Sequence, residues 1–345
     1  MAKVAVLGAG SWGTALSIVL ADNGHEVRLW SHRPEQVQTI NESNRNDRYL
    51  DAALPPEIRA YEDMGEAVRG TDAVVIVVPT KAIREVCRKL DDVVDRKTSI
   101  VHASKGIEPV TLKRVSQMIS EEMRQCTYED IVVLSGPSHA EEVAMRQPTT
   151  VTVASLNEEE ARLIQDLFIN ESFRVYTSTD LLGIEFGGAL KNIIALGAGI
   201  SDGLGYGDNA KAALITRGLA EISRLGTSMG ANPLSFLGLS GVGDLIVTCT
   251  STHSRNWRAG NLLGKGNRLD DVLDEMGMVV EGVRTVKAAH QFAIDQNVEM
   301  PITSGLYQIL FEEKTPKDVV EQLMNRTKRE EMDDLAKQLM ERYSC

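Results

Sequence analysis

A glycine pattern near the start of the chain has the spacing of a loop that binds nucleotide phosphates. Gly8, Gly10 and Gly13 form a GxGxxG pattern after a predicted strand over 3–7 and at the start of a predicted helix over 11–23. The first glycine permits a tight turn, the second lets the backbone approach a pyrophosphate, and the third permits close helix–strand packing. The helix N-terminus offers N–H groups to the phosphates. A glycine turn without a ligand is the alternative, and the strand–turn–helix context disfavours it.

The end of the next predicted strand, 26–31, indicates which dinucleotide binds. NAD sites usually carry Asp or Glu at this point to hold the ribose 2′-hydroxyl. This chain instead has Ser31-His32-Arg33. A guanidinium suits a 2′-phosphate because it makes charge-assisted bidentate contacts. The sequence therefore favours NADP over NAD, unless Arg33 only stacks on the adenine and discriminates weakly.

Further polar segments lie where a substrate could bind. Residues 102–106 and 134–141 each follow a predicted strand, and open α/β sheets bind ligands at the carboxyl ends of their strands. Lys191 lies inside a Gly/Ala-rich helical run, and Asp244 precedes the polar segment 254–258. Lysine and aspartate can transfer protons, and lysine and arginine can bind anions.

The elements that must position these residues alternate between short β-branched runs and helical stretches up to about residue 176. Runs that are apolar on both faces indicate buried, mostly parallel strands covered by helices. The first half is therefore predicted to be a doubly wound, Rossmann-type α/β domain. Its strand candidates are 3–7, 26–31, 72–78, 98–102, 131–135, 149–154 and 172–176.

After about residue 180 the strand signals stop, which predicts an all-helical second domain. The expected division is 1–180 for the dinucleotide-binding domain and 181–345 for the substrate-binding domain, with a small-molecule cleft at their junction. The predicted helices are 182–203, 209–229, 254–264, 281–296, 302–313 and 329–342.

Bulk composition excludes several classes of function. The 345 residues carry a formal net charge of −12, so the surface as a whole should repel nucleic acid and anionic membranes. The four cysteines have no spacing typical of a metal or disulfide site. No signal sequence or stretch of about 20 apolar residues is evident, so a cytoplasmic protein is expected.

The motifs together resemble the bacterial-type NAD(P)-dependent glycerol-3-phosphate dehydrogenases. The matching segments run from residue 6 to about 285: GAGSWGTAL, SKGIE, LSGPSHAEEV, GALKNIIALGAGI, GVGDLIVTCTSTHSRN and VVEGVRT. The resemblance implies a Rossmann domain followed by a helical domain like that of 6-phosphogluconate dehydrogenase. It also implies a homodimer that reduces dihydroxyacetone phosphate to glycerol 3-phosphate, with NADPH and also NADH as possible coenzymes, for phospholipid synthesis.

The same resemblance implies a role for each matching residue. Lys191 would be the catalytic acid/base. The substrate would contact Lys105, Gly136, Ser138, Lys191, Asp244, Ser254, Arg255 and Asn256. The coenzyme would contact Gly8, Gly10, Ser11, Trp12, Gly13, His32, Arg33, Lys105, Ala140, Arg255, Val279 and Glu281.

The chemistry of these side chains agrees with the implied roles, although simpler roles remain open. A ketone reduction needs a proton for the developing alkoxide, and lysine can supply it when burial or a nearby cation such as Lys105 lowers its pKa. Arg255, the Asn256 amide and backbone N–H groups suit a phosphate dianion. The alternatives are a solvated surface lysine at Lys191 and simple helix caps at Asp244 and Ser138.

Two other functions fit parts of the sequence. A reductase for a carboxylate substrate would share the fold and the helix-borne lysine, but inorganic phosphate would hardly compete with its substrate. A non-catalytic dinucleotide sensor would need the glycine loop, but not the set of Lys105, Lys191, Asp244 and Arg255.

Overall fold

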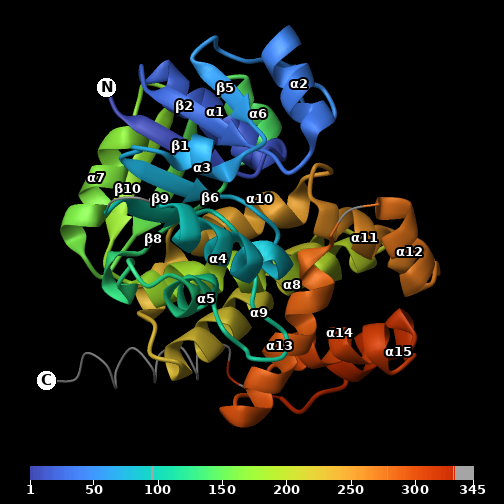
Figure 1. The fold of residues 1–345 in the computed structure, drawn as a ribbon. Coiled ribbons are helices and arrows are strands. Elements are labelled where there is room, and N and C mark those ends of the chain that lie inside the picture. The colour runs from blue at the N-terminus through green and yellow to red at the C-terminus, as the bar shows by residue number, and fades with distance from the viewer. Residues whose placement is uncertain (95–96, 278, 329, 331–345) are drawn as a thin grey trace, which may run out of the picture. The chain divides into compact units, whose positions relative to one another are not determined.

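The computed structural model describes residues 1–94, 97–277, 279–328 and 330 (Figure 1). The chain divides into two compact units. Unit 1 contains Met1–Lys105 and Lys113–Leu181, and unit 2 contains Gly106–Leu112 and the chain from Leu182 onward. The predicted helix over 329–342 and the C-terminal tail fall outside the described residues, apart from residue 330.

Unit 1 is built on an eight-stranded sheet with the order β10-β9-β8-β7-β6-β1-β2-β5. The predicted Rossmann-type sheet is confirmed, because the run from β7 to β5 is parallel throughout. The strands are β1 (Lys3–Leu7), β2 (Glu26–Trp30), β5 (Ile58–Tyr61), β6 (Ala73–Ile76), β7 (Ser99–His102), β8 (Val132–Ser135), β9 (Thr149–Ala154) and β10 (Phe173–Ser178).

The sheet differs from the sequence prediction at both of its edges. Strand β5 was not predicted, because it is short and Arg59 and Tyr61 leave one side of it open to solvent. At the other edge β9 pairs antiparallel with β8, and β10 pairs parallel with β9. A small separate ribbon joins β3 (Arg45–Asn46) and β4 (Leu50–Ala53).

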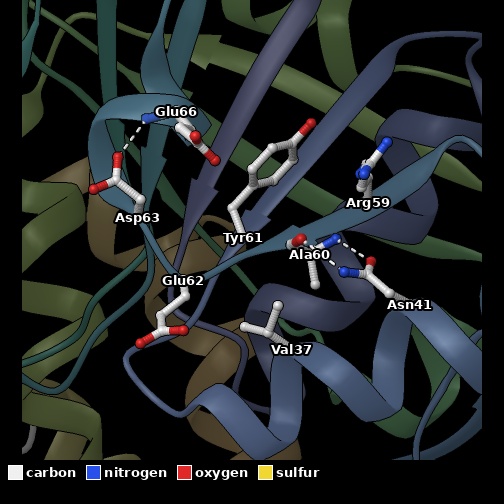
Figure 2. A pocket seen from close by; sticks show the side chains of 8 residues that line it. All are labelled: Val37, Asn41, Arg59, Ala60, Tyr61, Glu62, Asp63 and Glu66. Carbon is white, nitrogen blue, oxygen red and sulfur yellow. Dashed lines mark hydrogen bonds between the residues drawn. The ribbon is translucent and has the colours of Figure 1, made fainter.

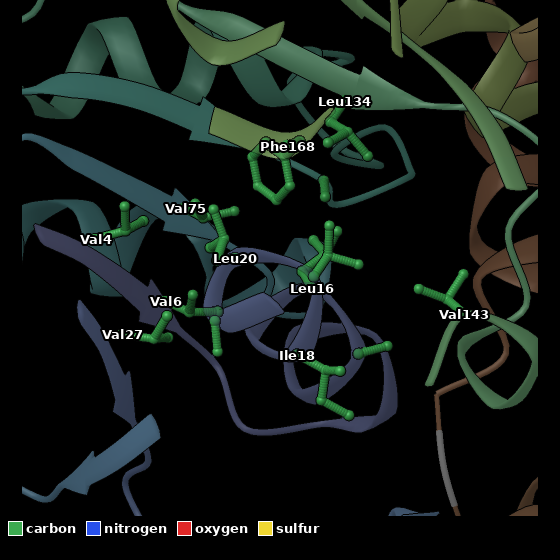
Figure 3. Packing of buried hydrophobic residues seen from close by; sticks show 14 of the residues in the cluster. Val4, Val6, Leu16, Ile18, Leu20, Val27, Val75, Leu134, Val143 and Phe168 are labelled. Carbon is green, nitrogen blue, oxygen red and sulfur yellow. The ribbon is translucent and has the colours of Figure 1, made fainter. Parts of the chain in front are cut away.

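Alternating strand residues supply an apolar core to each face of the sheet. Val4 and Val6 pack on one face with α1 (Ser11–Asp22), α6 (Ala140–Ala144) and α7 (Glu158–Phe168), as Figure 3 shows for Leu16, Val143 and Phe168. Ala5 and Leu7 face the opposite core, with α3 (Met64–Val68), α4 (Ile83–Val93) and α5 (Val115–Glu122). Both cores therefore hold the carboxyl ends of the central strands in fixed register.

The regular elements in the described part of unit 2 are all helical, as predicted. Its central element is α8 (Leu181–Gly203), which is long and apolar enough to cross a membrane by length and composition alone. However, 94% of its most apolar window is buried inside the structure, as expected for a core helix. Ile107 and Leu112 pack into the same core, which explains why their short segment belongs to this unit.

Five of the predicted helices are found in unit 2 with small changes at their ends. They are α8, α9 (Asp208–Ser228), α11 (Arg255–Gly264), α13 (Glu281–Asp295) and α14 (Pro301–Phe311). Shorter elements were not predicted, namely a 3₁₀ turn at Pro233–Leu237, a π-helical turn at Leu239–Gly243, α10 (Asp244–Thr250), α12 (Leu269–Met276) and α15 (Pro316–Met324).

Candidate active site

The glycine loop of unit 1 has room for a ligand at one glycine and none at the other two. A Cβ at Gly8 (φ +123°) would lie 2.5 Å from the Val77 carbonyl oxygen, and one at Gly13 would lie 1.9 Å from that of Gly8. A Cβ at Gly10 would meet nothing within 4 Å. Gly8 and Gly13 are thus required by packing, whereas Gly10 leaves open space before the N-terminus of α1. The loop therefore fits a pyrophosphate.

The two residues after Gly10 begin α1 and hold its first turn in place. Ser11 donates a hydrogen bond from its hydroxyl to the backbone oxygen of Tyr49 at 2.8 Å. Trp12 is half-buried and packs against the apolar core beneath the sheet. Both residues therefore stand at the glycine loop, where their backbone N–H groups belong to the unpaired first turn of the helix.

The segment after β2 stands at the same edge of the sheet as the glycine loop. Leu7 and Trp30 are in register on neighbouring parallel strands, so both strands end at the same level. His32 is exposed, and the half-buried Arg33 precedes the first residue of α2 (Pro34–Ser43). The backbone N–H of Arg33 donates to the Ser31 hydroxyl at 3.2 Å. Arg33 therefore follows the end of β2, and its role at a 2′-phosphate stays a prediction.

Three of the predicted substrate residues meet in unit 1 at the ends of β7 and β8. Lys105 Nζ donates to the Gly136 carbonyl oxygen at 3.4 Å, and the Ser138 hydroxyl donates to the same oxygen at 3.0 Å. Gly136 has a φ of +147°, and a Cβ there would lie 2.9 Å from Val151 Cα. The interpretation of Ser138 as a helix cap is wrong, because His139 is the N-cap residue of α6. The buried Ala140 follows as the first helical residue.

Lys191 lies in the interior of unit 2 and is paired with a carboxylate. Its side chain is 7% exposed, and Nζ donates to Asp244 Oδ1 at 2.5 Å and to Thr248 Oγ1 at 2.6 Å. The Thr248 hydroxyl in turn donates to the Asp244 backbone oxygen at 2.5 Å. Lys191 is therefore not a solvated surface lysine. Asp244 is the first residue of α10 and Gly243 is its N-cap residue, so the capping interpretation is also wrong.

The contact between α8 and α10 depends on glycine and on an irregular helical turn. A Cβ at Gly187 would lie 2.5 Å from the Ser240 backbone oxygen, inside the π-helical turn that precedes Asp244. Gly187 stands about one helical turn before Lys191. Close approach at this point therefore brings the N-terminus of α10 to the lysine. π-Helical turns are frequent at functional sites.

The predicted anion-binding residues stand at the N-terminus of α11. The Ser254 hydroxyl accepts a hydrogen bond from the Trp257 backbone N–H at 3.2 Å, as an N-cap residue does. Arg255 is exposed and is the first helical residue. Asn256 is buried, and its side chain donates to Asn192 Oδ1 at 2.9 Å.

The Asn256 side chain also receives a hydrogen bond, from the Gly282 backbone N–H at 2.8 Å. It therefore ties α8 to the N-terminus of α13, where Glu281 is the first residue and Val279 lies just outside the helix. The sequence did not predict this bridging role. The Asn256 amide was instead predicted to bind the phosphate of the substrate. The backbone N–H of Asn256, in the first turn of α11, remains a donor suited to an anion.

A separate hollow of about 470 Å³ lies at the β5 edge of the sheet in unit 1 (Figure 2). The Asn41 side chain hydrogen-bonds both the N–H and the carbonyl of Ala60 there, at 2.9 and 3.0 Å, and so covers the open edge of β5. The described lining includes none of the residues predicted for coenzyme or substrate: Val37, Asn41, Arg59, Ala60, Tyr61, Glu62, Asp63 and Glu66. The hollow is therefore not assigned to the reaction.

The described residues contain no group of three or more His, Cys, Asp or Glu side chains arranged to hold a metal ion. Cys87, Cys126 and Cys249 are free thiols. Burial raises the pKa of each of them to about 12, so these thiols stay protonated and unreactive at neutral pH.

Comparisons with known proteins identify the family of the chain. Family models described as the N-terminus and C-terminus of NAD-dependent glycerol-3-phosphate dehydrogenase match residues 3–161 and 180–321. The chain is 78% identical over 344 residues, a coverage of 100% of each chain, to the glycerol-3-phosphate dehydrogenase (NAD(P)+) of Oceanobacillus iheyensis. It is 61% identical over 336 residues, 97% of both chains, to the enzyme of the same description from Bacillus subtilis.

Solved structures give the same result. The crystal structure of glycerol-3-phosphate dehydrogenase from Coxiella burnetii matches 94% of this chain and 99% of its own, with 38% identity and a TM-score of 0.89. A D-mandelate dehydrogenase structure with 15% identity and a TM-score of 0.61 shares the fold alone, over 92% of this chain and 99% of its own. This chain belongs to the NAD(P)-dependent glycerol-3-phosphate dehydrogenases.

Proposed function

We propose that this enzyme reduces dihydroxyacetone phosphate to sn-glycerol 3-phosphate with Lys191 as the proton donor and with NADPH preferred over NADH. The observation that carries the proposal is the buried arrangement of Lys191, Asp244 and Thr248 in unit 2. A buried ammonium that is held by a carboxylate and a hydroxyl is oriented by both of them. Such a group suits proton transfer to one defined oxygen.

Residues of this chain are assigned to the proton transfer and to the binding of the phosphate group. Bound NADPH supplies the hydride that C2 of the ketone accepts. Lys191 donates a proton to the carbonyl oxygen as it becomes an alkoxide, and Asp244 stabilises the lysine side chain during the transfer. Arg255 and the N–H groups at the start of α11 bind the phosphate, because that helix end carries partial positive charge. Lys105 and Ser138 contribute further polar contacts to the substrate.

The coenzyme residues are assigned to unit 1 and to the start of α13. Gly8, Gly10, Ser11, Trp12 and Gly13 bind the pyrophosphate, and His32 with Arg33 binds the adenosine end. The remaining coenzyme contacts come from Lys105, Ala140, Arg255, Val279 and Glu281. In this scheme residues 1–180 work as the dinucleotide-binding domain and residues 181–345 as the substrate-binding domain. The enzyme works as a cytoplasmic homodimer and supplies glycerol 3-phosphate for phospholipid synthesis.

A substrate panel tests the reaction. NADPH oxidation is followed with dihydroxyacetone phosphate, with dihydroxyacetone and with a 2-ketoacid, and inorganic phosphate is added as a competitor. Turnover confined to the phosphorylated ketone and inhibited by phosphate is the expected result. Turnover of the 2-ketoacid without phosphate inhibition would instead support a carboxylate reductase.

Variants test the assigned roles. Lys191→Ala should bind NADPH normally and lose about 10²–10⁴-fold in kcat, as is typical for loss of a general acid. A kcat near that of the wild type would remove Lys191 from the mechanism. For coenzyme choice, kcat/KM is measured with NADPH and NADH, and a clear preference for NADH would contradict the assignment of Arg33.

A further inference from the structure

A hydrogen-bond network behind the glycine loop is not used by the mechanism above. Its centre is the Gln36 side chain, in the first turn of α2. Nε2 donates to the Ala9 backbone oxygen at 2.6 Å and to Asn46 Oδ1 at 3.0 Å, and Oε1 accepts from the Ser31 hydroxyl at 2.7 Å. A backbone carbonyl can only accept, so Ala9 fixes which way the amide faces.

Asn46 provides a second set of contacts to the same loop. It is 2% exposed, and its Nδ2 donates to the Ala9 oxygen at 3.0 Å and to Thr14 Oγ1 at 2.7 Å. Ala9 stands between the first two glycines of the loop, so its carbonyl receives two side-chain donors. The loop is thereby tied both to α2 and to the first turns of α1.

The network reaches the 2′-phosphate side through Ser31. Its hydroxyl donates to Gln36 and accepts from the Arg33 backbone N–H at 3.2 Å, and Ser31 is 2% exposed. One side chain, that of Gln36, therefore connects the loop proposed to bind the pyrophosphate with the segment proposed to bind the 2′-phosphate. Ser31 and Asn46 are buried and Gln36 is half-buried, and hydrogen-bond networks shielded in this way are rigid when every member is satisfied.

We propose that Gln36 is a positioning residue for the coenzyme that acts without touching it. Through Ala9 it sets the direction of the N–H groups around Gly10, and through Ser31 it sets the backbone from which Arg33 projects. The inference rests on the proposed function for the places of the pyrophosphate and the 2′-phosphate. Sites whose ligands are held in advance bind more tightly, because less ordering is needed on binding.

Gln36→Leu tests the loop contact, since leucine keeps much of the volume and removes every hydrogen bond. KM should rise about tenfold for NADPH and for NADH, which corresponds to about 1.4 kcal/mol. The kcat and the KM for dihydroxyacetone phosphate should stay within about twofold, because the hydrogen bonds of Gln36 go to Ala9, Ser31 and Asn46, none of which is assigned to the substrate. Gln38→Leu is the matched control, because Gln38 is exposed on the same helix and its side chain donates to Glu42, one turn along that helix.

Ser31→Ala tests the contact to the Arg33 segment alone, because it leaves the hydrogen bond from Gln36 to Ala9 intact. We expect kcat/KM to fall about threefold with NADPH and to stay unchanged with NADH. Selectivity is the ratio of kcat/KM with NADPH to kcat/KM with NADH. The double variant Ser31→Ala/Arg33→Ala should lose no more selectivity than Arg33→Ala alone, because Ser31 acts through Arg33.

The outcomes distinguish this inference from the proposed function. Unchanged coenzyme KM in Gln36→Leu, or a fall in kcat alone, would overturn the positioning role. So would additive losses of selectivity in the double variant Ser31→Ala/Arg33→Ala. If Arg33→Ala itself left selectivity unchanged, the proposed place of the 2′-phosphate would fail, while the loop contact would still be judged by Gln36→Leu alone.

Discussion

Lys191 is a charged side chain inside an apolar helix, and its neighbours explain how the fold accommodates it. An isolated buried charge is very costly, whereas a paired and hydrogen-bonded one is tolerated. Asp244 supplies the opposite charge and Thr248 supplies an uncharged acceptor. The resemblance suggested Lys191 and Asp244 from motifs, but no spacing rule indicated that they would form a 2.5 Å pair. The role of Thr248 is likewise visible only once α8 and α10 are side by side.

Replacing the Thr248 hydroxyl should weaken catalysis without removing it. The hydroxyl hydrogen is directed at the Asp244 backbone oxygen, so an oxygen lone pair faces Lys191 Nζ. Thr248→Val keeps the shape but loses this acceptor, and we expect kcat to fall about tenfold. Thr248→Ser should restore most of the loss. Steady-state kinetics with dihydroxyacetone phosphate check this, and equal kcat values in the Val and wild-type enzymes would contradict it.

Gly10 offers a test of the coenzyme loop that leaves folding unaffected. Its φ of −78° and ψ of −177° suit any residue, and a Cβ there meets nothing within 4 Å. Gly10→Ala should therefore melt like the wild type, while its KM for NADPH rises at least about tenfold because the methyl group occupies the pyrophosphate space. Gly13→Ala is the contrasting variant, since its Cβ would lie 1.9 Å from the Gly8 oxygen, and it should be destabilised. A normal KM in Gly10→Ala would argue against this placement of the phosphates.

At the scale of elements, the sequence predicted what repeats regularly and missed what is irregular. Strand β6 is a continuous apolar run, β1 is apolar after Lys3, and α8 is a long apolar helix, so their types and positions follow from pattern. The π-helical turn at Leu239–Gly243 has no such pattern, because it is set by packing against Gly187. The antiparallel pairing of β9 with β8 could not be predicted either, because the direction of a strand depends on the strands it pairs with and not on its own pattern.

The packing of α8 on α11 depends on glycines that let the two backbones approach. A Cβ at Gly199 would lie 2.0 Å from the Trp257 backbone oxygen, and one at Gly260 would lie 2.0 Å from that of Leu196. This approach sets the position of Asn256, and hence of the N-terminus of α11, relative to Lys191. The Asn192–Asn256 hydrogen bond forms across the same pair of helices.

Gly199→Ala should therefore harm both stability and activity. The added methyl group must displace backbone, which we expect to lower the free energy of unfolding by about 3 kcal/mol and to lower kcat/KM for dihydroxyacetone phosphate. Gly197→Ala is the control on the same helix, because its Cβ would meet only the ends of the Leu214 and Leu306 side chains, at 3.4 Å and beyond. That variant should stay within about 1 kcal/mol of the wild type. Denaturant unfolding followed with both variants checks the difference.

At the scale of the whole molecule, the stability of the helical unit depends on the buried carboxylate of Glu221, which amino-acid composition alone could not identify. Glu221 of α9 is 2% exposed and accepts hydrogen bonds at the start of α14. Its oxygens accept from the backbone N–H groups of Ile302 at 2.6 Å and Thr303 at 3.1 Å, and from the Thr303 hydroxyl at 3.1 Å. It thus supplies partners for donors that a helix N-terminus leaves unpaired, across 81 residues of sequence.

Burial raises the pKa of Glu221 to about 7, and these hydrogen bonds only partly oppose the rise. Because the folded state holds the proton more tightly than the unfolded state, the protonated form stabilises the fold. That contribution is complete below the ordinary glutamate pKa of about 4.5 and is lost as the pH rises through about 7. The free energy of unfolding should therefore fall by up to about 3 kcal/mol across this window on account of Glu221.

Glu221→Gln should flatten this part of the stability profile, because glutamine stays neutral at every pH in the window. Unfolding by denaturant at a series of pH values between about 5 and 8 measures the slope. Glu321→Gln in α15 is the control, because Glu321 is exposed and should leave the slope as it is. If Glu221→Gln kept the wild-type slope, the pH dependence would have to come from other groups. The carboxylate would then be ionised in the fold at neutral pH, stabilised by the positive end of α14.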